Sequence, residues 1–389
     1  MWLILHTIFW ISFGLVVYVY AGFPVCLLLL TWRKRTIPPP IPSDNALPSI
    51  SFVVAAYNEE LVIEEKLRNC LRLEYPKEKL TFIFVSESTD GTNDILLRYR
   101  SPQIKVRIMP ERGGKVASLT AAFPMCEGDV LVFSDANTYY WPDSLKMLAR
   151  HFVDPQIGVV TGDVRLLPSK HKFGQGEGLY YKYERRLQEL ESAFWSTVAI
   201  DGGMYAIRRE YFKPVSSRLI VLDDFVFTMN VARKGYRIIY DAEAVAEEDP
   251  TPGDAQEFWH KVRVVATAIQ SVLDGEGVPP PRQIRLWWLY VSHKLLRWFV
   301  PFYLIFMFLA SGVAAFNSQW WAGMLAAQAA FYVLALSAWR APNLAALPFR
   351  VPYYFCMVNL AALGGILRGF RRQERGVWTP TERHVPPRT

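Results

Sequence analysis

Both ends of the chain are apolar, whereas its middle alternates short apolar runs with polar clusters. The stretch from Trp2 to Trp32 contains no Asp, Glu, Lys or Arg and is long enough to cross a bilayer with some tilt. It also lacks the basic start and the small-residue cleavage site of a secretion signal. The pattern therefore predicts a transmembrane helix within residues 1–35.

The flanking residues predict on which side of the membrane the middle of the chain lies. Arg33, Lys34 and Arg35 follow the apolar run, and the positive-inside rule keeps such charges in the cytoplasm. Residues 36–47 contain four prolines and form a stiff, non-helical linker. We therefore expect residues 48–278 to form a cytoplasmic domain at an inner or plasma membrane.

A second apolar region follows Pro279, Pro280 and Pro281. Residues 279–298 mix basic residues with Trp and Leu, as in an amphipathic helix lying at a membrane interface. Three apolar runs then predict a C-terminal transmembrane region over residues 299–370: 299–316, 320–339 and 352–367. A basic tail, residues 371–389, ends the chain.

These segments conflict in their topology. One span before the cytoplasmic domain and three after it would place the basic tail outside, whereas the positive-inside rule places it inside. One segment is therefore expected to be re-entrant or interfacial, with the irregularity between Pro342 and Pro352.

The middle region alternates apolar strands with helical stretches. Strands are predicted over 49–56, 80–85, 105–109 and 128–133, and helices over 61–73 and 95–100. This alternation predicts an α/β domain with a doubly wound, mostly parallel sheet. Ligands of such sheets bind beyond the carboxyl ends of the strands, which is where the polar clusters of this chain occur.

Composition narrows the function classes. Of the 389 residues, 51% are hydrophobic and 14% aromatic, which excludes a disordered chain. The net charge of +7 fits membrane-flanking basic residues and does not indicate a nucleic-acid partner. The four cysteines show no metal-ligand spacing, which favours a reduced cytosolic domain.

Seven polar motifs follow one another through the domain. In order they are Ala55-Ala56-Tyr57-Asn58-Glu59, Ser86-Glu87-Ser88-Thr89-Asp90-Gly91-Thr92, Gly113-Gly114-Lys115, Ser134-Asp135-Ala136-Asn137, Asp201-Gly202-Gly203-Met204, Leu222-Asp223-Asp224-Phe225 and Phe258-Trp259-His260-Lys261-Val262-Arg263. In this order, between membrane segments, they resemble the inverting glycosyltransferases of family 2. The resemblance is to the membrane-embedded group with cellulose, chitin and hyaluronan synthases. It implies a GT-A domain joined to transmembrane and interfacial helices.

The resemblance implies a nucleotide-sugar donor, expected to be a UDP-sugar. Nucleotide-binding residues would be Ala56, Tyr57, Asn58, Glu59 and Glu87, together with Lys115, Asp135 and Arg263 near the diphosphate. A lysine ammonium there offsets charge that develops on the leaving nucleotide. The first two motifs also fit a helix cap and a plain turn.

Asp135 and Asn137 stand where the family carries its metal motif. A carboxylate and an amide carbonyl are hard oxygen ligands, so we expect them to hold Mg²⁺ or Mn²⁺ against the diphosphate. Asn137 replaces a second acid, which should weaken metal binding when no nucleotide is present.

Asp223 and Asp224 correspond to the acidic pair of the family. Asp224 is expected to be the general base that takes the proton of the attacking hydroxyl, with Asp223 orienting it. Acceptor-binding residues implied by the resemblance are Asp201, Gly202, Gly203 and Trp378.

The last motif departs from the polymerising synthases, which carry QxxRW. Here His260 replaces the glutamine and Val264 replaces the tryptophan. In the second motif, Ser86 stands where the family has an aspartate that binds the nucleotide's uracil. The resemblance implies transfer of a sugar to a polysaccharide acceptor, possibly processive with secretion. The departures leave open an alternative, transfer of one sugar to a lipid carrier or glycolipid, and a lesser one, a silent subunit of a secretion complex.

Overall fold

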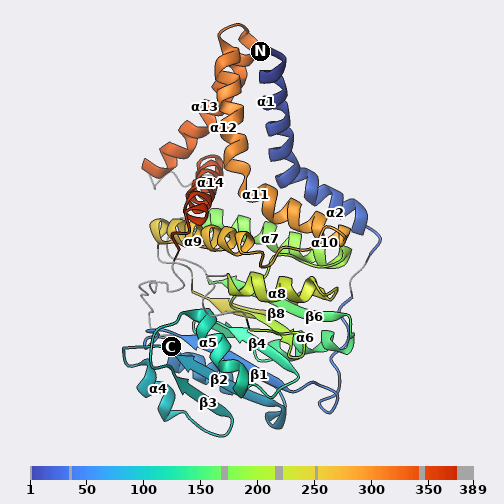
Figure 1. Ribbon diagram of the computed structural model, residues 1–389, viewed down its shortest axis with the longest axis vertical. Helices are drawn as coiled ribbons and strands as arrows, with labels where there is room; N and C mark the ends of the chain where they lie inside the picture. The colour runs from blue at the N-terminus through green and yellow to red at the C-terminus, as the bar shows by residue number, and fades with distance from the viewer. Residues whose placement is uncertain are drawn as a thin grey trace.

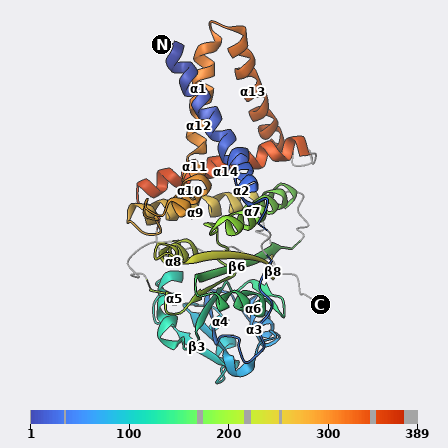
Figure 2. The same ribbon diagram turned by 90° about the vertical axis from the view of Figure 1, so that its right-hand side faces the viewer.

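The computed structural model describes residues 2–34, 37–167, 174–214, 222–249, 253–340 and 347–374. The molecule is elongated, with the sheet at one end and a group of long helices at the other (Figures 1 and 2). The N-terminus lies at the tip of the helical end, far from the sheet.

One mixed sheet of eight strands organises the domain, in the order β3-β2-β1-β4-β7-β6-β8-β5. Four of the seven strand pairings are parallel. The strands are β1 (Ile50–Ala56), β2 (Leu80–Ser86), β3 (Ile104–Ile108), β4 (Val130–Ser134), β5 (Thr138–Tyr140), β6 (Ile157–Leu166), β7 (Tyr205–Arg208) and β8 (Arg237–Glu248). The prediction of a mostly parallel GT-A sheet is confirmed.

The four predicted strands are β1 to β4, each found within about two residues of its expected bounds. In β1, β2 and β4 the side chains alternate between two buried layers, which is why these strands appear as continuous apolar runs, whereas β3 carries Lys105 and Arg107 and is partly exposed. Phe52 and Val54 of β1 pack into one core, and Val53 packs into the other. The sheet is thus covered on both faces.

Helices of the domain cover these faces and carry several of the motifs. They are α3 (Ile63–Leu71), α4 (Thr92–Arg98), α5 (Lys115–Ala122), α6 (Ser144–Ala149), α7 (Gly174–Phe194), α8 (Asp223–Ala232) and α9 (Asp254–Leu273). In both ribbon views α8 lies between the sheet and the layer formed by α7 and α9 (Figures 1 and 2).

The predicted N-terminal span is one helix built of α1 (Trp2–Val17), a π-helical turn η1 (Tyr18–Gly22) and α2 (Phe23–Thr31). The predicted interfacial segment forms α10 (Ile284–Tyr290), a second π-helical turn η5 (Val291–Leu295) and α11 (Leu296–Trp298). It bends by 56° into α12 (Val300–Ala315). Helix α13 (Gln319–Arg340) and α14 (Leu347–Phe370) follow.

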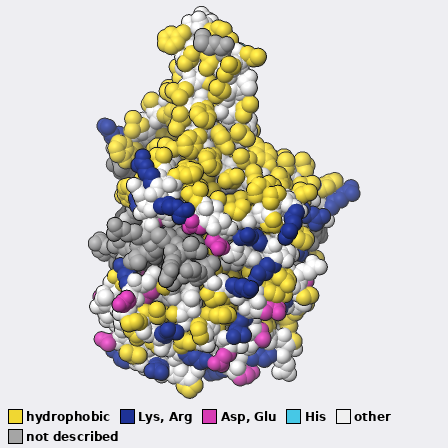
Figure 3. Space-filling view, viewed as in Figure 1, with side chains coloured by type: hydrophobic (Ala, Val, Ile, Leu, Met, Phe, Trp, Pro, Cys, Tyr) yellow, Lys and Arg dark blue, Asp and Glu magenta, His cyan; other side chains and the backbone are white. Residues whose placement is uncertain are grey.

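Three helices of the described chain are long and apolar enough to cross a membrane: Trp2–Thr31, Gln319–Arg340 and Pro348–Phe370. The bent pair of Ile284–Trp298 and Val300–Ala315 makes a fourth if it is one span. Their side chains make one end of the molecule almost wholly hydrophobic, and Lys and Arg side chains appear below the edge of this apolar surface (Figure 3). The surface agrees with membrane association through the helical end.

Helix α14 differs from the other apolar helices in direction. Whereas α1 and α12 follow the long axis of the molecule, α14 runs across it and lies on α9 (Figures 1 and 2). Glycines permit this close packing: a Cβ at Gly365 would lie 2.7 Å from the Val262 carbonyl oxygen, and one at Gly369 would lie 2.8 Å from that of Ala266. Of the range expected to be irregular, Pro342 to Pro352, residues 342–346 lie outside the described residues and residues 347–352 form the start of this helix.

Candidate active site

The motif residues gather at one edge of the sheet because β1, β2 and β4 are parallel and end side by side. Ala56 is the last residue of β1, and Asn58, at φ 54°, turns the chain just after it. The Asn58 Oδ1 accepts the backbone N–H of Thr89 at 2.9 Å, and the Asn58 N–H donates to Ser88 Oγ at 2.9 Å. These bonds join the loops after β1 and β2.

Tyr57 and Glu59 flank that turn. The guanidinium of Arg112 lies 3.6 Å from the centre of the Tyr57 ring, a cation–π contact that the sequence did not indicate. The Glu59 N–H donates to Thr92 Oγ1 at 2.9 Å. Their contact with a nucleotide stays a prediction.

Glu87 fixes the loop that carries Lys115. Its Oε2 accepts the Gly114 N–H at 2.8 Å, and its Oε1 accepts the Ser118 hydroxyl at 2.7 Å. Gly114 adopts φ 85°, which an L side chain rarely does, so the glycine is required at this turn. Glu87 is therefore a support of the loop, and its expected contact with the nucleotide base stays a prediction.

Lys115 lies between two carboxylates. Its Nζ is 2.8 Å from Asp135 Oδ1 and 3.2 Å from Asp223 Oδ2. Burial alone would lower the pKa of Lys115, but these two carboxylates raise it above its ordinary value. The ammonium is thus charged and ties the end of β4 to the start of α8.

The donor set near Asp135 suits a hard divalent cation that also binds phosphate oxygens. The Asn137 Nδ2 donates to Glu248 Oε1 at 2.6 Å, which leaves the amide oxygen to act as a ligand. Within the described ranges no group of three or more His, Cys, Asp or Glu side chains could hold a metal. A metal bound by Asp135 and Asn137 would therefore need further ligands, as Mg²⁺ takes from substrate phosphates.

Lys66 was missed by the sequence analysis. Its fully buried ammonium donates to Ser134 Oγ at 2.7 Å and to the Thr138 carbonyl oxygen, directly beneath the metal motif. The faces of Phe52 and Tyr140 lie 5.1 and 4.9 Å from it. Burial lowers the pKa of Lys66 to about 8.

Asp223 begins α8, and Asp224 is its second residue. The Phe225 N–H donates to Asp224 Oδ1 at 2.7 Å. Burial, together with the adjacent charge of Asp223, raises the pKa of Asp224 to about 7. A carboxylate with this pKa can accept a proton near neutral pH, as a general base requires.

The Asp201 loop lies against this carboxylate. A Cβ at Gly202 would be 3.2 Å from Asp224 Oδ2, and one at Gly203 would be 2.6 Å from Thr138 Oγ1. Asp201 Oδ2 is 2.9 Å from Arg185 Nη2, and its Oδ1 accepts the Gly203 N–H at 3.1 Å. Asp201 therefore shapes the loop, while the glycines allow its close approach.

Arg263 approaches the same carboxylates from α9. Burial lowers the pKa of Arg263, while the charges of Asp223 and Asp135 act in the opposite direction. Its Nη2 lies 3.4 Å from His260 Nδ1. Burial and the Arg263 charge lower the pKa of His260 to about 4, so this imidazole is neutral at pH 7. Trp378 lies outside the described residues.

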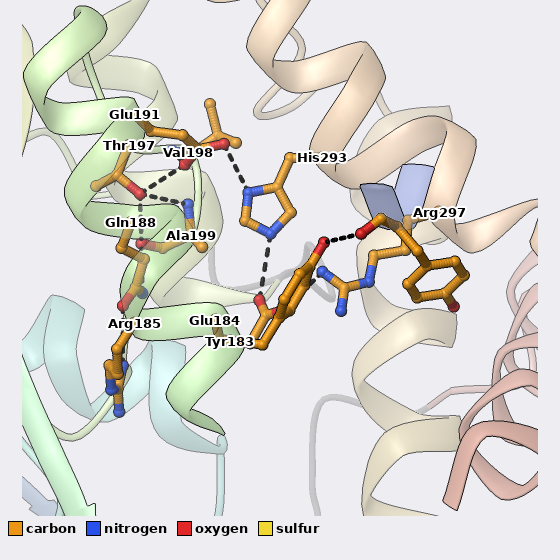
Figure 4. Close-up of polar contacts among 11 residues, drawn as sticks. Tyr183, Glu184, Arg185, Gln188, Glu191, Thr197, Val198, Ala199, His293 and Arg297 are labelled. Carbon is orange, nitrogen blue, oxygen red and sulfur yellow. Dashed lines mark hydrogen bonds and ion pairs between the residues drawn. The ribbon is translucent and has the colours of Figure 1, made fainter. Parts of the chain in front are cut away.

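A second polar cluster joins α7 to the helical end (Figure 4). His293 Nδ1 lies 2.7 Å from Glu191 Oε1, and its Nε2 lies 3.2 Å from Glu184 Oε2. Arg297 Nη1 is 2.6 Å from Glu184 Oε1. These contacts fix the segment α10–η5–α11 to the layer above α8.

The sequence profile described as "Glycosyltransferase like family 2" matches residues 48–267. A probable glycosyltransferase, YdaM, of Bacillus subtilis (strain 168) is 26% identical over 268 residues, covering 63% of this chain and 62% of that protein. The β-monoglucosyldiacylglycerol synthase of Nostoc sp. (strain PCC 7120 / SAG 25.82 / UTEX 2576) is 26% identical over 228 residues, with 56% and 48% covered.

The poly-β-1,6-N-acetyl-D-glucosamine synthase of Staphylococcus aureus (strain COL) is 25% identical over 209 residues, covering 52% of this chain and 50% of that protein. The matches thus span about half to three fifths of these relatives. Among solved structures, the mannosyltransferase PcManGT from Pyrobaculum calidifontis, in complex with GDP-Man and Mn²⁺, shares the fold at a TM-score of 0.71 and 23% identity. That alignment covers 94% of this chain and 100% of that one. With more than half of its length matched by the family profile, the chain belongs to glycosyltransferase family 2.

Proposed function

We propose that this protein is a membrane-bound inverting glycosyltransferase that moves a sugar from a nucleotide-sugar donor to an acceptor at the bilayer. The observation that carries the proposal is Lys115, held between Asp135 and Asp223 with Asp224 next along the chain. Groups suited to a diphosphate therefore stand beside a carboxylate suited to remove a proton.

The donor diphosphate would lie along Lys115 and Arg263. Asp135 and Asn137 would hold Mg²⁺ or Mn²⁺ against it, and the bound metal would offset the negative charge of the leaving diphosphate. The metal in the PcManGT complex supports a divalent cation at such a site. A UDP-sugar remains our expected donor, and GDP-sugars belong in the test because PcManGT is in complex with GDP-Man.

Asp224 would act on the acceptor. Its carboxylate takes the hydroxyl proton as the acceptor oxygen forms a bond to the anomeric carbon of the sugar. The bond from that carbon to the diphosphate breaks, and the nucleoside diphosphate leaves toward Lys115. Attack from the face opposite the leaving group inverts the anomeric centre, as the family resemblance implies.

The acceptor we favour is a lipid that receives one sugar. Asp224 lies in the helix layer between the sheet and the apolar helices, and Val264 leaves no aromatic platform at the position where polymerising synthases carry tryptophan. One relative is named as a glycolipid synthase and another as a polysaccharide synthase. Product size separates the two: one added sugar supports the lipid acceptor, and a ladder supports polysaccharide extension.

The direction of α14 supports a topology that removes the conflict in the sequence. With α1, α12 and α13 as spans and α14 on the membrane surface, the sheet domain and the basic tail are both cytoplasmic, as the positive-inside rule requires. In a cysteine-free background, Asn317→Cys between α12 and α13 should react with an impermeant maleimide in intact cells. Ser101→Cys in the sheet domain should react only after permeabilisation.

The function itself is tested by nucleotide release. Purified protein in lipid nanodiscs is incubated with UDP- and GDP-sugars, Mn²⁺ or Mg²⁺ and lipid acceptors, and compared with Asp224→Asn. Release from one donor in the wild type, reduced about 10²- to 10⁴-fold in the variant at unchanged donor affinity, is the expected result. Donor binding with no release from any donor and acceptor would instead favour a silent subunit.

A further inference from the structure

The segment α10–η5–α11 carries two polar groups that no described residue satisfies. The buried Tyr290 hydroxyl has no hydrogen-bond partner within the described chain. Among the same residues, the partly buried Lys294 ammonium has neither a hydrogen bond nor an ion pair. A buried donor such as the Tyr290 hydroxyl normally has a partner, because leaving it unpaired costs free energy.

Three other polar side chains on this segment make polar contacts. Ser292 Oγ lies 2.8 Å from the Tyr18 hydroxyl, and His293 lies between Glu184 and Glu191 (Figure 4). Arg297 pairs with Glu184. Tyr290 and Lys294 therefore lack polar partners on a segment that the contacts of its neighbours hold in place; among the described residues the buried Arg297 Nη2 also has no hydrogen bond.

Both groups belong to the helix face that meets α8. The Phe225 ring, next to Asp224, lies 6.3 Å from the ring of Tyr290 and 6.3 Å from that of Trp298. Lys294 is four residues from each of these aromatic residues, so all three share one face. A helical side chain also leans toward the helix N-terminus, which brings the Lys294 stem toward Tyr290.

This placement puts Lys294 within electrostatic reach of the proposed base. Burial and Asp223 raise the pKa of Asp224, and Lys294 is among the cations that lower it. Lys115 reaches this carboxylate pair from the sheet, whereas Lys294 comes from the helical, membrane side. The two cations therefore reach the carboxylate pair from different elements, Lys115 from the start of α5 and Lys294 from η5.

We propose that Lys294 and the Tyr290 hydroxyl form an anion subsite for the phosphate group of a lipid acceptor, whose free hydroxyl is then presented to Asp224. This inference rests on the proposed function and names its acceptor class. Lysine binds phosphate as a compact charge, and a phenol adds a directed hydrogen bond. Phosphate would supply the acceptors that both groups lack, and the adjoining bilayer supplies phospholipids.

Two conservative variants test the subsite. Tyr290→Phe removes only an unpaired hydroxyl, so the fold should keep or slightly raise its melting temperature. Lys294→Met removes the charge at similar volume, and Lys294→Arg keeps it. Arg285→Met, an exposed cation at the start of α10, is the matched control for general loss of membrane-surface charge.

The first readout is binding, independent of turnover. We measure the affinity of short-chain phosphatidylglycerol and of short-chain diacylglycerol for detergent-purified protein, with nucleoside diphosphate present. Lys294→Met should weaken phosphatidylglycerol binding about tenfold or more and Tyr290→Phe by a few-fold, with diacylglycerol unchanged. Lys294→Arg and Arg285→Met should stay near the wild type. Equal affinity of Lys294→Met and the wild type for the phospholipid would overturn the subsite.

The second readout is transfer. Lys294→Met should raise KM for a phosphate-bearing lipid acceptor at unchanged Kd for the nucleotide sugar, and should leave KM for a neutral lipid unaltered. An equal loss with both acceptors would assign Lys294 to the base instead and reject the subsite. Absence of transfer in the wild type, with phospholipid binding still dependent on Lys294, would reject the proposed function and keep the subsite.

Discussion

Gly202 leaves just enough room for the carboxylate of Asp224: a Cβ at position 202 would lie only 3.2 Å from Asp224 Oδ2. We predict that Gly202→Ala displaces this carboxylate by a few tenths of an ångström and lowers kcat by about 10-fold or more, because small displacements of a reacting group are costly. Donor Kd should not change. Gly253→Ala, where no atom lies within 4 Å of the added Cβ, is the matched control.

The activity should depend on pH through Asp224. Burial and Asp223 raise the pKa of Asp224 to about 7, and the base works only when deprotonated. The rate kcat/KM should therefore rise with pH through about 7 and level off above it. Asp223→Asn removes a neighbouring negative charge, so the midpoint should move to lower pH. A midpoint that stays in place in this variant would show that another group controls the profile.

Lys115 should control metal binding as well as catalysis. In the protein without metal, its ammonium pairs with Asp135 at 2.8 Å. Lys115→Met frees that carboxylate, so Mn²⁺ affinity without nucleotide should increase while nucleotide release falls by about 10²-fold or more. Electron paramagnetic resonance of free Mn²⁺ measures the first effect. Weaker Mn²⁺ binding in the variant would contradict the prediction.

Lys66 should stabilise the loop that carries the metal motif. Lys66→Met leaves the Ser134 hydroxyl and the Thr138 carbonyl without their donor, and the free energy of unfolding should fall by about 1–3 kcal/mol. The loss in the double variant Lys66→Met with Ser134→Ala should be smaller than the sum of the single losses, since the two residues share one bond. Thermal unfolding in detergent measures each value.

The contact between α14 and α9 should be needed for stability. Gly365→Ala places a methyl group 2.7 Å from the Val262 carbonyl oxygen, so the helices must separate, at a cost of about 1–3 kcal/mol. The melting temperature should fall, and activity should fall with it because α9 carries Arg263. Gly323→Ala in α13, which has open space around it, should leave both unchanged.

The strands that could be predicted from sequence are mainly those whose own residues form a recognisable apolar pattern. Strands β1, β2 and β4 are buried on both faces and are continuous apolar runs, whereas β8 carries Glu243 and Glu247 within its length and offers no such run. The sequence also placed Lys115, Asp135 and Asp224 in one site through their motifs, and the structure brings Lys115 against Asp135.

Other features depend on contacts between distant segments. Lys66 is a basic residue in an amphipathic helix, and such residues normally face water. Its partners Ser134 and Thr138 are far away in the sequence and become its neighbours only in the folded domain. His293 and Glu184 are 109 residues apart. For α14, composition is the same for a spanning and a surface helix, so its direction is set by glycine contacts with α9 that no local pattern encodes.

In the proposed topology, the position of α14 would set the distance between the catalytic domain and the lipid. In the proposed topology this helix separates α9 from the lipid, and a helix with its side chains is about 10–12 Å thick. A lipid acceptor whose polar head group is shorter than this thickness would have to expose part of its acyl chains to reach the site. Each exposed CH₂ group costs about 0.8 kcal/mol. In this topology α14 would thus act as a spacer, and we expect the enzyme to select acceptors by length as well as by chemistry.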